Sequence, residues 1–117
     1  MTQHGALSRG AFAVTVLVSL VVLFTPASGV PTAPAGVDKL VHVALFAALA
    51  GTGRWAGAGA VRLAVALTVY AAGSEVIQGF APLARSGSLA DWIADAAGIL
   101  LGLALWDLLA RRAGPAR

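Results

Sequence analysis

The sequence lacks cysteine and is poor in charge. With no cysteine in 117 residues, disulfide bonds and thiolate chemistry are excluded. Charged residues make up 11% of the chain, whereas an ordinary soluble domain contains about 25%. Hydrophobic residues make up 59%. The chain therefore has too little polar surface for an ordinary soluble domain, and its composition is typical of a membrane protein.

The sequence also lacks a basic patch, although its net charge is +3. Its Lys and Arg residues are spread between apolar runs without interleaved aromatic residues, which argues against nucleic acid as a partner. The lipid bilayer is the expected partner, and the basic residues are better interpreted as signals of membrane topology.

Apolar stretches separated by Gly- and Pro-rich loops predict an all-α, polytopic membrane protein. A bilayer span needs about 20 residues. The expected transmembrane helices cover about residues 9–27, 38–55, 61–80 and 89–110, in one domain formed by residues 1–117. Trp55 and Trp106 fall near one set of helix ends and Trp92 near the other, as expected for residues at membrane interfaces.

The first apolar run has a second interpretation. Residues 1–28 contain Arg9, a short apolar segment and the small-residue stretch TPASG, which together are also typical of a cleaved signal peptide. The protein has four spans if this segment is retained and three if it is removed. In both cases the chain emerges on the outer side.

The positions of the basic residues predict the orientation. One set of helix ends carries Arg9, Arg54, Arg62, Arg111, Arg112 and Arg117, whereas the opposite set carries Lys39 and Arg85. Cytoplasmic loops contain the excess of Lys and Arg. Both termini are therefore expected in the cytoplasm, in a multi-pass protein of the bacterial plasma membrane.

Polar residues gather at the ends predicted to face outward. They are Asp38, Lys39, His42, Glu75, Gln78, Arg85, Asp91 and Asp95. Three predicted helices and one loop contribute to this set, which is the candidate ligand-binding site. Ionisable residues inside apolar segments are candidates for function by default.

Spacing places several of these residues on shared helix faces, because residues three or four apart are neighbours on a helix. Asp91 and Asp95 are one such pair, and the same face continues through Gly98 and Gly102, a pattern that permits close helix packing. We therefore expect Asp95 to point into the bundle and to pair with His42, Arg85 or Lys39. The two glycines are also candidates for a homo-oligomer contact.

Structural interpretations stand beside the functional ones. Asp38 fits a helix N-cap, Asp91 fits a capping box with Ser88, and Lys39 fits an interfacial anchor. Glu75, Gln78, His42 and Asp95 also fit an internal hydrogen-bond network. Asp107 and Arg111, spaced i, i+4, are expected to form a structural ion pair.

The motifs DKLVH, EVIQGFAP and RSGSLADWIADAAGILLG, taken in this order, resemble those of the VanZ-like family of small bacterial membrane proteins. The resemblance covers about residues 37–105. It implies a cell-envelope protein associated with resistance to glycopeptide antibiotics, teicoplanin in particular, and assigns the eight polar residues above to the family's polar positions. Where the family usually has asparagine, this chain has Asp95, which adds a negative charge unless it is protonated or paired.

Several functions fit this pattern. The first is binding of a lipid-like, lipid-linked or cell-wall-related ligand, glycopeptides included, in an outward-facing pocket. The alternatives are an acid–base or metal-assisted enzyme acting on a lipid headgroup, with Glu75, His42 and Asp95 as catalytic candidates, and a proton-coupled transporter. The chain has no H-E-x-x-H motif and one candidate histidine, which argues against a metal enzyme. No cofactor is expected.

Overall fold

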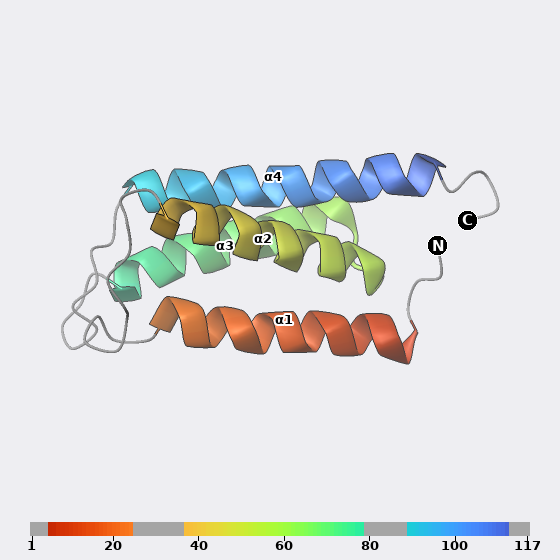
Figure 1. The fold of residues 1–117 in the computed structure, drawn as a ribbon, viewed down its shortest axis with the longest axis horizontal. Helices are drawn as coiled ribbons and strands as arrows, with labels where there is room; N and C mark the ends of the chain where they lie inside the picture. Colours follow the sequence, from red (N-terminus) through yellow and green to blue (C-terminus); the bar gives the residue numbers. More distant parts are fainter. Residues whose placement is uncertain (1–4, 25–36, 79–88, 113–117) are drawn as a thin grey trace.

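The computed structural model describes residues 5–24, 37–78 and 89–112. Within these residues the chain is all-α and forms four helices, α1 (Ala6–Phe24), α2 (Val37–Trp55), α3 (Ala60–Gln78) and α4 (Leu89–Arg112). The helices lie side by side along one long axis, and the start of α1 and the end of α4 are at the same end of the bundle (Figure 1).

The observed helix bounds differ from the expected ones by a few residues. Helix α1 begins at Ala6 because its first turn is already closed by the bond from Arg9 N–H to Gly5 O, 3.1 Å, and by the Ser8 hydroxyl, which donates to the same oxygen. Helix α4 continues to Arg112 because basic residues are favourable in the last turn of a helix. Residues 25–27 and 79–80, which were expected to be helical, lie outside the described residues.

A tight turn joins α2 to α3. Gly57 has a φ of 102°, a backbone conformation that suits glycine. The N–H of Ala58 donates to Gly53 O and the N–H of Gly57 donates to Arg54 O, both at 3.0 Å. These two bonds form a Schellman motif, which ends a helix while satisfying its last carbonyl groups. Helices α2 and α3 therefore form a closed hairpin.

Two glycines set the close approach of α4 to α2. A Cβ at Gly98 would lie closer than 3.0 Å to Val43 O, and a Cβ at Gly102 would lie closer than 3.0 Å to Ala47 O. Real Cβ atoms do not approach backbone oxygens so closely, so only glycine fits. These positions contact α2 of the same chain, and a homo-oligomer through them stays a prediction.

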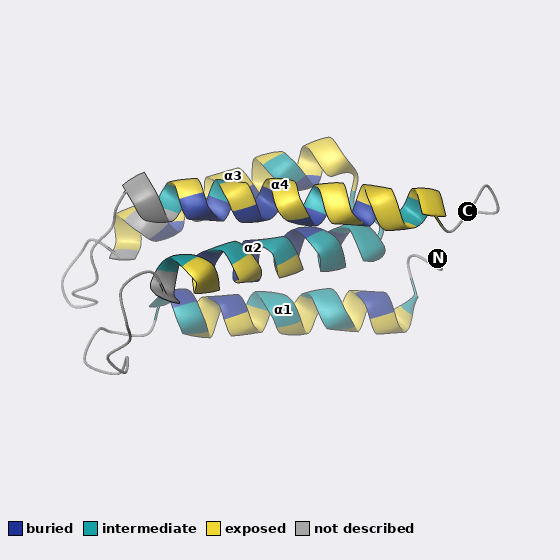
Figure 2. Cartoon of the chain, turned by 45° about the horizontal axis from the view of Figure 1, so that its top comes forward, coloured by how far each residue is buried: buried dark blue, intermediate teal, exposed yellow. Residues whose placement is uncertain are grey.

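The bundle has an apolar core, but it also exposes many large hydrophobic side chains. Large hydrophobic side chains are exposed on every described helix, for example Leu7, Leu40, Val61 and Leu100. Figure 2 shows exposed residues along the outer sides of the helices. The buried residues also include polar ones, namely Ser8, Ser19, His42, Ser74 and Asp95. This pattern suits a protein whose outer surface faces lipid.

Among the described helices, α1 over Ala6–Phe24 and α4 over Trp92–Arg112 are long and apolar enough to cross a bilayer, and Ala60–Ser74 of α3 is a shorter apolar helix. At 1.5 Å per residue, the 19 residues of α1 span roughly 29 Å, close to the hydrocarbon thickness of about 30 Å. These two helices are compatible with a membrane protein. The four-span arrangement and its orientation stay predictions.

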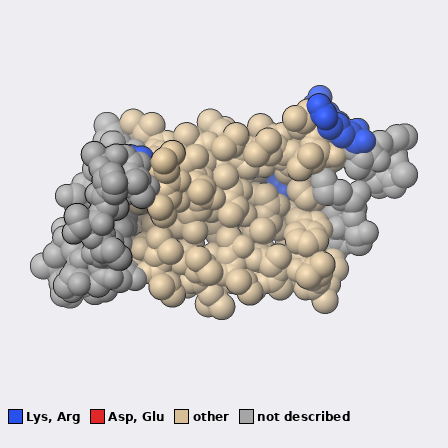
Figure 3. All heavy atoms as spheres, in the orientation of Figure 1, with Lys and Arg blue, Asp and Glu red and all other residues tan. Residues whose placement is uncertain are grey.

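The bundle has two chemically different ends. We call the end that contains the start of α2, the end of α3 and the start of α4 the polar end (Figure 1). The opposite end, with the start of α1 and the end of α4, is the basic end. The basic end carries Arg9, Arg54, Arg62, Arg111 and Arg112. On the face shown in Figure 3, uncharged residues form most of the surface between these ends, and the largest group of basic atoms is near the C-terminus.

A candidate polar site inside the helix bundle

The candidate site is built around a buried pair of side chains from α2 and α4. The Nδ1 atom of His42 lies 2.6 Å from Oδ1 of Asp95. His42 is 2% exposed and Asp95 is 0% exposed. The two residues lie where α2 and α4 pack closely. Gly98 of α4 approaches the carbonyl of Val43 of α2. Asp95 is one turn before Gly98, and His42 is next to Val43. The expected pairing of Asp95 with His42 is confirmed.

The geometry of this pair defines the roles of its atoms. A carboxylate only accepts hydrogen bonds, so an ionised Asp95 requires the hydrogen of His42 to be on Nδ1. In the neutral ring, Nε2 is then the basic nitrogen. The same arrangement, in which an aspartate orients an imidazole and stabilises its charged form, supports general acid–base chemistry in many hydrolases. The pairing also gives a partner to two groups that are costly to bury alone.

A second buried polar contact lies between α1 and α3, and the sequence analysis did not predict it. The hydroxyl groups of Ser19 and Tyr70 are 2.8 Å apart. We call Ser19, His42, Tyr70 and Asp95 the polar cluster, and each of the four helices contributes one of these residues. It consists of two hydrogen-bonded pairs, which are linked by packing of Tyr70 against Phe46, one turn after His42.

Aromatic and small residues surround this polar cluster. Phe46, one turn after His42 on α2, is 0% exposed, and its ring centroid is 5.8 Å from that of Tyr70. Ser74, one turn after Tyr70 on α3, is buried and donates its hydroxyl hydrogen to Ala71 O at 2.9 Å. The cluster is thus closed on the side of the basic end by the apolar core around Phe46.

The other expected site residues are placed less completely. Asp38 and Lys39 are in the first turn of α2, Glu75 and Gln78 are in the last turn of α3, and Asp91 is in the first turn of α4. Their backbones are thus all at the polar end (Figure 1). Lys39 is half-buried. Arg85 lies outside the described residues, as do the side chains of Asp38, Glu75, Gln78 and Asp91.

The described residues contain no group suited to hold a metal ion, and an exposed ion pair lies at the opposite end of the bundle. No group of three or more His, Cys, Asp or Glu residues is placed there to hold a metal ion. The ion pair between Arg111 Nε and Asp107 Oδ2, 3.1 Å, is at the basic end and is exposed. It has the structural, i, i+4 character expected from the sequence.

Comparison with known proteins identifies no relative, since no family model, no curated protein and no solved structure matches the chain. The interpretation of the site therefore depends on its own geometry and chemistry.

Proposed function

We propose that this chain is a multi-pass protein of the bacterial plasma membrane that binds a lipid-like or cell-wall-related ligand at its polar end. In this arrangement all four described helices span the bilayer, both termini are cytoplasmic and the polar end faces outward. The exposed hydrophobic side chains and the buried polar ones support membrane embedding. The basic residues at the opposite end support the orientation.

The observation that carries the proposal is the buried His42–Asp95 pair at 2.6 Å. An unpaired aspartate at the centre of a transmembrane helix costs about 2.5 to 3.5 kcal/mol. A protein that needed only to pack α2 against α4 would use apolar residues at these positions, because buried ion pairs are weak stabilisers compared with apolar packing. The pair is therefore better explained by recognition or chemistry at the polar end.

The resemblance to VanZ-like proteins gives the proposal its ligand class. Under this resemblance, the ligand is a lipoglycopeptide such as teicoplanin or a lipid-linked precursor of the cell wall. Lys39 and Arg85 would meet its phosphate or carboxylate groups, and the carboxylate and amide residues would fix its orientation. The hydrogen bond with His42 is compatible with this assignment, because it gives Asp95 a buried partner where the family usually has asparagine.

A second candidate function is acid–base catalysis on a lipid headgroup. The observation that favours it is the direction of the contact, since Asp95 binds Nδ1 of His42 and leaves Nε2 as the basic nitrogen of the neutral ring. Removing the orienting aspartate of such a pair lowers turnover by about 10⁴-fold in a serine protease. Binding and catalysis can therefore be separated by Asp95→Asn.

The test is a binding measurement on the full chain reconstituted in phospholipid vesicles, with teicoplanin and a polyprenyl phosphate as probes. We expect saturable binding of at least one probe, which Asp95→Leu and His42→Leu abolish. Asp95→Asn should retain binding, because asparagine is the residue that the family usually has there. Asp107→Asn removes an exposed carboxylate at the basic end and is the matched control, with binding unchanged.

Two outcomes separate the functions. The same vesicles are also assayed for a chemical change in the polyprenyl phosphate. If the wild-type chain converts this lipid to a product, and Asp95→Asn binds the lipid but forms no product, the catalytic interpretation replaces simple binding. If the folded wild-type chain binds neither probe, or if Asp95→Leu binds as well as the wild type, the proposed site is wrong.

A further inference from the structure

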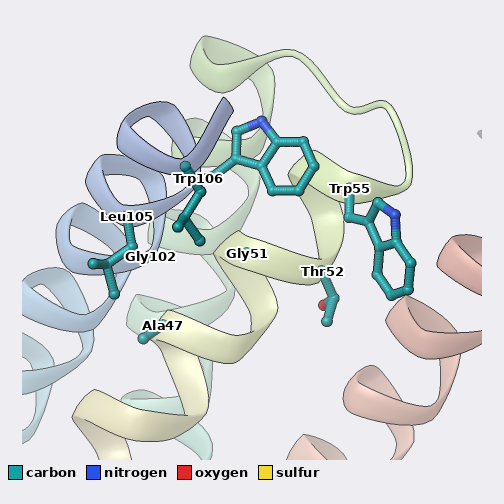
Figure 4. Close-up of a pocket in the computed structure, with 8 residues that line it drawn as sticks. Ala47, Gly51, Thr52, Trp55, Gly102, Leu105 and Trp106 are labelled. Atoms are coloured by element: carbon teal, nitrogen blue, oxygen red, sulfur yellow. The ribbon is translucent and has the colours of Figure 1, made fainter. Parts of the chain in front are cut away.

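A groove lies between α2 and α4 at the basic end, away from the polar cluster. Its volume is about 330 Å³. Among the residues that line it are Gly51 and Trp55 of α2 and Gly102, Leu105 and Trp106 of α4. Figure 4 shows the backbone of Gly51 between the two indole side chains, with Leu105 on the facing helix. The volume is within the range of pockets that bind small molecules, about 300 to 1,000 Å³.

The lining of the groove suits an apolar occupant. Thr52 contributes a hydroxyl group to the lining, but this hydroxyl already donates its hydrogen to Ala48 O of the same helix at 2.7 Å. Gly51 leaves space, because a Cβ built there would have no atom within 4 Å. The surface of the groove is therefore mostly apolar, and it offers few hydrogen-bonding groups to a polar molecule.

Two arginine residues lie on the same helix faces as residues that line the groove. Arg112 follows Leu109 by three residues and Leu105 by seven, and both leucines line the groove. Arg54 likewise follows Gly51 by three residues. Its Nη1 donates to Ala58 O at 2.7 Å, which leaves other N–H donors, since a guanidinium has five. The nearby acid, Asp107, is paired with Arg111. The rim of the groove toward the chain termini is thus positive.

We propose that this groove binds one acyl chain of an anionic phospholipid, whose phosphate group lies at Arg112 and Arg54. Apolar lining selects the acyl chain, and the positive rim selects a headgroup with net negative charge. Each Lys or Arg near a membrane surface contributes attraction to anionic lipid. The proposal rests on the proposed membrane embedding, and it is independent of what the polar end binds.

The tryptophans provide the measurement, because brominated acyl chains quench indole fluorescence on contact. In Trp92→Phe, emission comes from Trp55 and Trp106, which both line the groove. This variant is reconstituted in mixed vesicles of phosphatidylcholine and phosphatidylglycerol, with bromine on the acyl chains of one lipid or the other. At equal mole fraction of the brominated lipid, brominated phosphatidylglycerol should quench more strongly.

Two further variants, made in the same background, test the chemistry of the groove. Gly51→Leu fills it and should abolish the preference, whereas Gly73→Leu, at an exposed glycine with equally open surroundings, should keep it. Arg112→Gln should lower the preference for the anionic lipid by about fivefold. Arg9→Gln is its control, because α1 makes no contact with α4 among the described residues.

The results distinguish failure of the groove from failure of membrane embedding. Equal quenching by the two brominated lipids, or a preference that survives Gly51→Leu and Arg112→Gln, would overturn the groove proposal while leaving the membrane arrangement intact. If neither brominated lipid quenches any of the three tryptophans of the wild-type chain, the protein is not embedded, and both proposals fail.

Discussion

Ser19 of α1 and Tyr70 of α3 are joined by a hydrogen bond of 2.8 Å between their hydroxyl groups. Ser19 is 0% exposed, and its hydroxyl donates to Val16 O at 2.7 Å. Because a hydroxyl has one hydrogen, Tyr70 is then the donor in the bond between the two hydroxyl groups. This bond gives α1 a specific polar attachment to the rest of the bundle. It supplements the apolar contacts of Leu23 and Phe12.

Loss of either hydroxyl should weaken the attachment of α1. Hydrogen bonds between transmembrane helices contribute about 0.6 kcal/mol on average and at most about 1.7 kcal/mol. We expect Ser19→Ala and Tyr70→Phe each to lower the free energy of unfolding by about this amount, and the double variant to lose little more than either single one. Unfolding in mixed detergent micelles, followed by circular dichroism, measures these differences. Fully additive losses would show that the two hydroxyls do not interact.

The packing of α1 also predicts that residues 1–28 are retained in the mature protein. Leu23 is 0% exposed and belongs to the apolar core with residues of α2, α3 and α4, so removal of α1 would uncover that core. We expect the intact mass of the purified protein to include this segment. A mass that lacks it would mean a three-span protein and a cleaved signal peptide.

Removal of one partner of the buried pair should be costly. Breaking a buried ion pair costs about 3 to 5 kcal/mol, because the remaining charge loses its partner. We expect Asp95→Leu and His42→Leu each to destabilise the protein by this order. The double variant should be closer to the wild type than the sum of the single variants, because it leaves neither polar group alone.

The measurement for this pair is a double-mutant cycle in the same detergent system. Asp95→Asn is the informative third substitution, since it keeps an acceptor for the imidazole N–H but removes the charge, and it should destabilise less than Asp95→Leu. Single variants whose losses simply add would exclude a direct interaction between His42 and Asp95.

Glycine-to-alanine substitutions should have opposite effects at two helical positions. Gly98→Ala places a Cβ against Val43 O and should destabilise the contact between α2 and α4. Gly73→Ala meets no atom within 4 Å and should stabilise α3 by up to about 1 kcal/mol, because alanine has the higher helix propensity. Thermal unfolding of the two variants side by side provides the comparison. Equal unfolding temperatures of the two variants would mean that α2 and α4 are further apart than described.

The proposed orientation predicts which cysteines are labelled in intact cells. The chain contains no cysteine of its own, so single substitutions report without background. Ser86→Cys, in the segment between α3 and α4, should react with a membrane-impermeant maleimide. Ala60→Cys, at the exposed start of α3 on the basic end, should react only after the membrane is permeabilised. The reverse pattern would place the polar end in the cytoplasm and remove the outer-leaflet ligand from the proposal.

Sequence reasoning reached the polar pair because its residues are conspicuous. His42 and Asp95 are ionisable groups within apolar runs, and the spacing of Asp95 to Gly98 and Gly102 placed it on a packing face. The choice among His42, Arg85 and Lys39 as its partner required the structure, because the register of α2 against α4 depends on the close approach at the two glycines.

Ser19 and Tyr70 were not predicted, for a physical reason. Both are neutral, and both lie in helices that are apolar on nearly every face, so no polar or apolar stripe indicates which side is buried. Hydroxyl groups in such helices also bond to their own backbone, as Thr15 does to Ala11 O. Only the arrangement of α1 beside α3 shows which hydroxyl is used between helices.

The turn between α2 and α3 has a consequence for how the protein is made. Helix α2 carries Asp38, Lys39 and Arg54, whereas Ala60–Ser74 of α3 is apolar. Because Gly57 closes the turn with two backbone hydrogen bonds, the two helices can leave the ribosome and enter the membrane as one hairpin. In the proposed arrangement, the apolar segment then carries its more polar neighbour across the bilayer, and biosynthesis depends on a glycine far from the ligand.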